Sequence, residues 1–326
     1  MREIQFREAL NEAMSEEMRK DKSIIRLGEE VAEYNGAYKV SKGMLDEFGA
    51  ERIIDTPIAE LGFAGIAIGA AMNGLRPIVE FMTWNFAMVG IDQIVNNAAK
   101  MKNMSGGQID VPIVFRGASA SAGQLAATHS QSFECWYANC PGLKCVVPSN
   151  PADAKGLLKA AIRDNDPVLV FESEQMYGDK GEVPEGEYII PIGSARIHKQ
   201  GTDVTIASYG KIIKRVYEAA EILEKERISV EIIDLRSVRP IDYPTIIESI
   251  KKTNRLVLVE EAWPVANISA EIAFHVQRFG FDYLDAPVRR VCAPDVPMSF
   301  SKVLVEAYLP SVAKIIDAVK SVSYVA

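Results

Sequence analysis

The 326-residue chain has few histidines and cysteines and no excess of positive charge. It contains three histidines and four cysteines, and its net charge is −8 at pH 7. An acidic balance without a basic block argues against nucleic-acid binding. Cys135, Cys140 and Cys145 follow one another at five-residue intervals. That interval is not a zinc-binding pattern, so we expect buried thiols in a reducing compartment and no metal there.

Long hydrophobic runs are also missing. The most apolar stretch, Gly62 to Met72, is too short and too rich in glycine to cross a membrane. The first residues include the acids Glu3, Glu8 and Glu12, which a transit peptide would avoid, and they lack the apolar core of a signal peptide. We therefore expect no membrane partner, and either a cytoplasmic protein or the mature form of an organellar matrix protein.

What the chain does contain is a regular alternation of apolar strands and amphipathic helices. Strands are expected at 24–27, 52–55, 76–81, 111–115, 143–147 and 167–171, with helices such as 4–19, 86–101 and 151–163 between them. A second series begins with a strand at 203–208. Strands that are apolar on both faces predict parallel sheets covered on both sides. We expect an α/β protein with two domains, 1–190 and 191–326.

Glu60 stands at the start of an Ala/Gly-rich apolar run, 62–74, that reads as a tightly packed helix. Such a glutamate is either a first-turn residue favoured by the helix dipole or a desolvated catalytic acid. Ligands of parallel sheets bind at the carboxyl ends of the strands. There the sequence also places Phe86, which could be core or a stacking surface, and His129, which could be structural or catalytic.

Two familiar motifs are absent. The glycines of 62–74 do not form Gly-x-Gly-x-x-Gly, and we attribute them to close packing of the helix on the sheet instead of a dinucleotide site. Ser119 and Ser121 lie in Gly-Ala-Ser-Ala-Ser-Ala-Gly, which lacks the spacing of a hydrolase nucleophile elbow.

The first half carries several specific strings. They include Arg52-Ile-Ile-Asp-Thr-Pro-Ile-Ala-Glu-Leu-Gly-Phe-Ala-Gly65, Gly28-Glu-Glu-Val31, Glu80-Phe-Met-Thr83, Met104-Ser-Gly-Gly107 and His129-Ser-Gln131. With later matches such as Asp234-Leu-Arg236, they make almost the whole chain resemble the pyruvate dehydrogenase beta-subunit family, the decarboxylating components of 2-oxoacid dehydrogenase complexes. The resemblance implies a pyrimidine-binding thiamin diphosphate domain followed by a transketolase C-terminal-like domain.

The resemblance also assigns site residues. Glu60 matches the carboxylate that shares a proton with the aminopyrimidine ring of thiamin diphosphate, where an acid in apolar surroundings is needed. Phe86 matches the ring that stacks on the pyrimidine, and His129 the histidine that faces the substrate and the incoming lipoyl group. A potassium ion is implied at largely backbone carbonyls of Ile113, Ala161, Ile162, Asp164 and Asp166.

One absence is informative. The family of thiamin diphosphate enzymes holds Mg²⁺ and the diphosphate with Gly-Asp-Gly and a later Asn-Asn, whereas Gly178-Asp179 is followed here by Lys180, and Asn96-Asn97 lies upstream. We therefore expect an alpha subunit to bring both groups in an α2β2 assembly, with this chain inactive alone. The expected partner beyond it is a lipoyl acyltransferase core.

The leading function is oxidative decarboxylation of pyruvate with acetyl transfer to lipoyl groups. The alternative within the class is a beta subunit for acetoin or branched-chain 2-oxoacids, since Thr83-Trp84 departs from the expected Thr-Phe. From other classes, a non-catalytic scaffold of the same fold and a NAD-binding dehydrogenase remain to be separated.

Overall fold

The computed structural model describes residues 1–324. It divides into two compact units, the first formed by residues 1–119 and 136–192, the second by residues 120–135 together with those from 193 onward. The first domain expected from the sequence, 1–190, thus includes a segment, 120–135, that the structure groups with the second unit. In the described part of the chain, no helix combines the length and apolar character that crossing a membrane requires.

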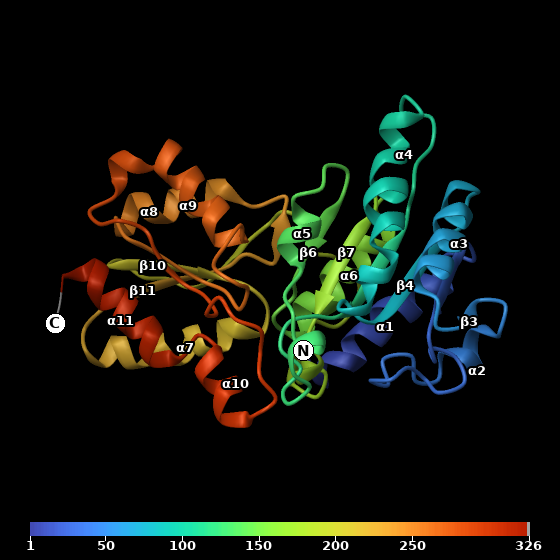
Figure 1. The fold of residues 1–326 in the computed structure, drawn as a ribbon, viewed down its shortest axis with the longest axis horizontal. Coiled ribbons are helices and arrows are strands. Elements are labelled where there is room, and N and C mark those ends of the chain that lie inside the picture. Colours follow the sequence, from blue (N-terminus) through green and yellow to red (C-terminus); the bar gives the residue numbers. More distant parts are fainter. Residues whose placement is uncertain (325–326) are drawn as a thin grey trace. The chain divides into compact units, whose positions relative to one another are not determined.

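The first unit is built on a parallel sheet with the strand order β6-β7-β5-β4-β2-β3 (Figure 1). Its strands are β2 (Ile24–Gly28), β3 (Ile53–Asp55), β4 (Arg76–Thr83), β5 (Val114–Ala118), β6 (Lys144–Val146) and β7 (Val168–Glu172). A small antiparallel pair joins β1 (Arg2–Gln5) to β8 (Lys180–Val183). The expected parallel α/β architecture is confirmed.

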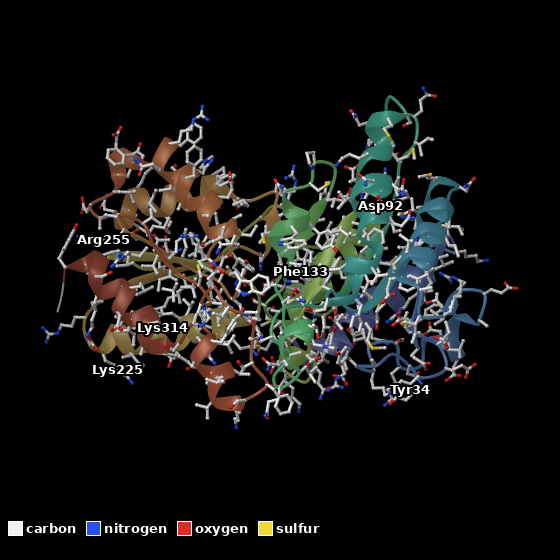
Figure 2. All side chains as sticks on the ribbon, in the orientation of Figure 1. Tyr34, Asp92, Phe133, Lys225, Arg255 and Lys314 are labelled. Atoms are coloured by element: carbon white, nitrogen blue, oxygen red, sulfur yellow. The ribbon has the colours of Figure 1, made fainter. Side chains whose placement is uncertain are left out.

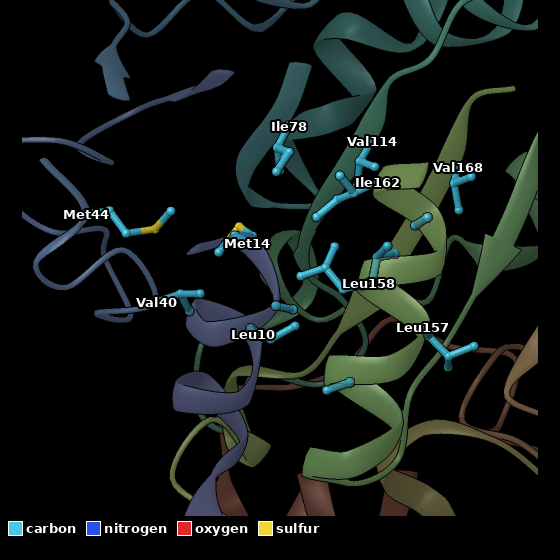
Figure 3. Packing of buried hydrophobic residues seen from close by; sticks show 14 of the residues in the cluster. Leu10, Met14, Val40, Met44, Ile78, Val114, Leu157, Leu158, Ile162 and Val168 are labelled. Atoms are coloured by element: carbon cyan, nitrogen blue, oxygen red, sulfur yellow. The ribbon is translucent and has the colours of Figure 1, made fainter. Parts of the chain in front are cut away.

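Helices α1 (Phe6–Lys20) and α6 (Pro151–Arg163) pack against each other and against this sheet. Figure 3 shows Leu10 and Met14 of α1 near Leu158 and Ile162 of α6, with strand residues such as Val114 beside them. These side chains are at most 4% exposed, and each contributes roughly 1.5–3 kcal/mol by leaving water. Other helical segments of the unit are α2 (Met44–Phe48), α3 (Glu60–Met72), α4 (Ala99–Met104) and the short η4 (Glu174–Met176). Helix α5 (Glu134–Ala138) includes residues of both units.

The strands are not apolar on both faces, and that expectation was wrong. Arg26 of β2, Glu80 of β4, Arg116 of β5 and Glu172 of β7 are all at most 4% exposed. Arg26 and Arg116 both pair with Glu80, and Arg116 also pairs with Glu172. Each of these four charged residues stands alone among apolar residues in its own strand. Buried charges are tolerated only when they are paired, and folding brings the four together in one network.

The packing of α3 also differs from the expectation. Its buried face consists of Phe63, Ala64, Ala67, Ile68 and Ala71, with Glu60 at its start. The helix therefore packs with alanine and larger side chains, and its glycines lie elsewhere: Gly62 is exposed, and a side chain at Gly65 would meet Gln93 at 3.2 Å. Close packing of glycine on the sheet is not observed, because the alanines occupy that face.

The segment expected as one helix over 86–101 is helical but irregular. It begins as a 3₁₀ turn, η1 (Phe86–Gly90), continues as a π-helix, η2 (Gln93–Ala98), and ends as α4. Both irregular pieces pack on α3. Short π segments inside helices often mark functional sites, and this one adjoins the helix that carries Glu60.

The second unit contains the sheet β14-β13-β10-β11-β9, in which only β9 runs antiparallel. Its strands are β9 (Arg196–Lys199), β10 (Val204–Ser208), β11 (Val230–Asp234), β13 (Leu256–Val259) and β14 (Arg289–Val291). The helices are α7 (Ile213–Lys225), α8 (Tyr243–Thr253), α9 (Ile268–Phe279), α10 (Lys302–Tyr308) and α11 (Val312–Ser323). Short elements complete it: β12 (Ser237–Arg239), η3 (Ala127–His129), η5 (Gly210–Ile212) and η6 (Phe281–Tyr283). Helices α7 and α11 pack on each other over this sheet.

Candidate functional site

Glu60 is the first residue of α3 and is only 7% exposed. The chain reaches it from β3, whose end is tied to that of β2 by the hydrogen bond from Thr56 N–H to the carbonyl of Gly28, at 3.0 Å. The Asp55 carboxylate accepts from the backbone N–H groups of Ala32 and Glu33, at 2.7 and 3.1 Å. These bonds hold the segment after β2 against the segment that leads into α3.

They also bring a second carboxyl group to the site. Glu29, directly after β2, is 5% exposed, and its Oε1 has no hydrogen-bond partner among the described residues. Burial, together with the negative charge of Glu60, raises the pKa of Glu29 to about 7. The buried Thr56 hydroxyl also lacks a partner within the described chain. Buried polar atoms without partners are costly, so a ligand that hydrogen-bonds to these atoms would stabilise this part of the unit.

Sequence reasoning noted Glu29 only as part of a strand-end motif and did not name it as a site residue. The available signal was an acid directly after a buried strand, on the edge where ligands of parallel sheets bind. What the pattern could not supply was the proximity of Glu60, which depends on the pairing of β2 with β3.

The raised pKa of Glu29 predicts a specific dependence of stability on pH. A carboxyl group with a higher pKa in the folded state stabilises the fold below its unfolded pKa, and that contribution is lost as the pH rises through the folded value. We expect the free energy of unfolding of the wild type to fall more steeply between about pH 4.5 and 7 than that of Glu29→Gln. Urea unfolding at several pH values measures this, with the exposed Glu33→Gln as control. Equal slopes for the wild type and Glu29→Gln would contradict the assignment.

Phe86 is the first residue of η1, which packs on α3. A side chain at Gly90, the last residue of η1, would meet the Glu60 carbonyl oxygen at 3.1 Å, so glycine allows η1 to lie directly on the first turn of α3. Phe86 itself is half-buried. The structure thus places Glu60, Glu29 and Phe86 on contacting elements of one unit.

Large apolar side chains of α3, of η1 and of the segment before α3 are exposed. Ile58 and Ile66 are 83% and 71% exposed, and Val89 is 63% exposed. Leu61 and Met88 lie beside them in the sequence and are also exposed. Exposed large apolar residues gathered on one pair of elements indicate a surface that another molecule covers.

His129 is not brought to Glu60 within this unit. It ends the short η3 of the second unit, where it is half-buried and its Nδ1 lies 3.0 Å from the Thr128 hydroxyl. Glu60 and Phe86 belong to the first unit and His129 to the second, so the expectation that acid, aromatic and histidine share one sheet edge stays a prediction.

The five positions named for potassium lie near the end of α6 and the start of β7, but several of their carbonyls already accept hydrogen bonds. Arg76 donates to the Ile162 carbonyl at 2.9 Å and to the Asp164 carbonyl at 2.6 Å. The Ala161 and Ile113 carbonyls accept from Asp164 and Val168, and the Asp166 carboxylate pairs with Lys102. A carbonyl oxygen has two lone pairs, so these hydrogen bonds do not by themselves exclude an ion, and the potassium site stays a prediction.

Residues 1–324 contain no group of three or more histidine, cysteine or acidic side chains arranged to hold a metal ion. The four cysteines are free thiols.

Comparison with known proteins covers both units. The transketolase pyrimidine-binding domain family matches residues 2–180, and the transketolase C-terminal domain family matches residues 193–315. A solved chain described as a split gene transketolase, inactive beta4 tetramer, has the same fold, with a TM-score of 0.81 at 23% identity over 99% of both chains.

Curated relatives are much closer in sequence. The pyruvate dehydrogenase E1 component subunit beta of Rhizobium meliloti (strain 1021) is 56% identical over 99% of this chain and 71% of its own length. The corresponding subunit of Rickettsia felis is 52% identical over 99% of both chains. The human mitochondrial subunit is 51% identical over 98% of this chain and 90% of its own.

Proposed function

This chain belongs to the pyruvate dehydrogenase E1 beta-subunit family, and we propose from this premise that it supplies the pyrimidine-binding half of a thiamin diphosphate site. The reaction is the oxidative decarboxylation of pyruvate, with acetyl transfer to lipoyl groups of an acyltransferase. The observation that carries the proposal is the buried pair Glu29 and Glu60 at the start of α3, where an acceptor oxygen and a hydroxyl lack partners among the described residues. These atoms fit the nitrogen atoms of an aminopyrimidine.

When bound, thiamin diphosphate supplies a ring carbon that attacks the 2-oxo group and accepts the electrons left when carbon dioxide departs. The residues of this chain have other tasks. Glu60 holds a proton at the ring nitrogen of the pyrimidine, which a buried carboxyl group does without competition from water. Phe86 stacks on the pyrimidine face. His129 donates a proton to the substrate or the lipoyl group.

The diphosphate and its Mg²⁺ belong to the alpha subunit in this proposal, within a heterotetramer. The two partial matches to the diphosphate motif lie in regular structure: Lys180 is in β8 and pairs with Gln5 of β1, while Asn96 and Asn97 donate to Asp92 and Gln93 of their own helical segment. The exposed apolar residues around Glu60 are the surface that the alpha subunit would cover. The potassium ion stays a proposal, and no step above depends on it.

Substrate choice between pyruvate and larger 2-oxoacids is the finer question. Trp84, where the sequence departs from the expected phenylalanine, is fully buried, stacks on Phe171 at 4.3 Å and donates to the Val170 carbonyl at 3.1 Å. It therefore belongs to the core and does not line an accessible pocket. This placement removes the feature that favoured acetoin or branched-chain substrates.

We accordingly expect the enzyme assembled with its cognate alpha subunit to turn over pyruvate faster than 2-oxoisovalerate or acetoin. One extra or missing methylene is worth about 10- to 200-fold, and the side group of 2-oxoisovalerate is larger than that of pyruvate, so a preference of at least about tenfold is expected. Initial rates with an artificial electron acceptor measure it. Faster turnover of 2-oxoisovalerate or acetoin would reassign the substrate, and no turnover with any of the three would contradict the proposed reaction.

A further inference from the structure

The parallel sheet of the second unit also has an edge formed by the carboxyl ends of its strands. A loop of the same unit occupies part of that edge. Lys211 follows β10, and Glu261 follows the adjacent parallel strand β13. In open α/β sheets this edge is where ligands bind. Here Ser121, from the segment that precedes His129, occupies the place between the two side chains.

The contacts converge on the backbone of Ser121. Its N–H donates to Glu261 Oε1 at 2.6 Å, and its carbonyl accepts from Lys211 Nζ at 2.6 Å. Lys211 also bonds the Ser121 hydroxyl and pairs with Glu261 at 3.2 Å. Ser121 is fully buried, and the side chains of Lys211 and Glu261 are 10% and 7% exposed. Charged groups that bond a backbone in a dry setting hold it firmly.

Ser121 belongs to a loop that is closed at its base. The Ala120 N–H donates to the Gln131 carbonyl at 3.1 Å, so the ends of residues 120–131 meet as in an Ω-loop. Ala120 and Ala126 have φ values of 63° and 66°, in the left-handed region that alanine rarely adopts. Such backbone persists only where surrounding contacts impose it. His129 lies within this loop.

We propose that Lys211 and Glu261 are positioning residues that hold the 120–131 loop, and with it His129, in its working conformation. The inference rests on the proposed role of His129 in proton transfer during acetyl transfer to lipoyl groups. It gives the second unit a task in the reaction.

The first test is amide hydrogen exchange of the assembled α2β2 enzyme. In Lys211→Met we expect peptides from 120–131 to exchange about tenfold faster, because local opening sets the exchange rate. Lys211→Arg keeps a cationic donor and should retain most of the protection. Lys225→Met is the matched control, since Lys225 is exposed at the end of α7 (Figure 2). Unchanged exchange in Lys211→Met would overturn the proposal.

The second test is a double-mutant cycle on the acetylation of a lipoyl domain. We expect His129→Gln to lower the rate about 100-fold, as loss of a proton donor does, and Lys211→Met about tenfold. If Lys211 acts through His129, the double variant is no slower than His129→Gln alone. Losses that multiply would overturn the proposal. Should Lys211→Met fail to assemble, Glu261→Gln replaces it, because the amide oxygen still accepts from Ser121 while the charge is lost.

The two hypotheses fail separately. Full activity of His129→Gln, with faster loop exchange in Lys211→Met, would remove the role of the histidine and keep the anchor. Reduced activity of His129→Gln, with unchanged hydrogen exchange of the loop in Lys211→Met, would keep the role of the histidine and remove the anchor.

Discussion

Glu60→Gln in the assembled enzyme is expected to lower turnover of pyruvate by about 100- to 10,000-fold, the range that a positioned acid contributes. Glutamine keeps the size of the side chain and can still hydrogen-bond, but it has no exchangeable acid proton to share with the pyrimidine. Glu60 is 7% exposed, so water cannot easily take over its role. Initial rates with the cognate alpha subunit at saturating thiamin diphosphate and Mg²⁺ measure the effect.

The matched control for this variant is Glu33→Gln. Glu33 follows the same strand as Glu29 but is exposed, and its structural contact is made by its backbone N–H, which the substitution keeps. We expect it to retain wild-type turnover. Near-normal activity in Glu60→Gln, with Glu60→Ala behaving alike, would show that the carboxyl group is not the proton carrier and would favour a scaffold.

The second large effect concerns the chain without its partner. Purified alone and given thiamin diphosphate, Mg²⁺ and pyruvate, it should show no turnover above background, and addition of the alpha subunit should restore full activity. The reason is that the described residues offer hydrogen-bonding groups for the pyrimidine, whereas the Asn96, Asn97 and Lys180 positions are occupied by local structure. The sequence has no Gly-Asp-Gly followed by Asn-Asn with which to hold the diphosphate.

Thermal denaturation tests independently whether the isolated chain binds thiamin diphosphate. Neither thiamin diphosphate nor NAD should raise the melting temperature of the isolated chain by more than about one degree, because a ligand stabilises only in proportion to its binding. Stabilisation by NAD would support the dehydrogenase hypothesis. Turnover by the isolated chain would show that this subunit binds the diphosphate itself.

The local pattern of apolar and polar residues was sufficient to predict much of the architecture. Apolar runs of four to eight residues between amphipathic stretches predicted the parallel strands, since burial on both faces demands such runs. The same approach failed where charges such as Arg26 and Glu80 lie inside those runs. The free-energy cost of burying these charges is offset because they pair with opposite charges on neighbouring strands. Which strands become neighbours cannot be predicted from the sequence of any single strand.

The sequence by itself determined the family, the two-domain α/β fold and the identity of Glu60, Phe86 and His129 as candidates, because these depend on residue types within short segments. Only the tertiary structure showed that Glu29 faces the charge of Glu60, that Gly90 lets η1 lie on α3, and that the loop carrying His129 is fastened to the second unit by Lys211 and Glu261. Each of these contacts joins segments far apart in the chain. Such contacts depend on how strands pair and helices pack, which hydrophobic periodicity along one segment does not specify.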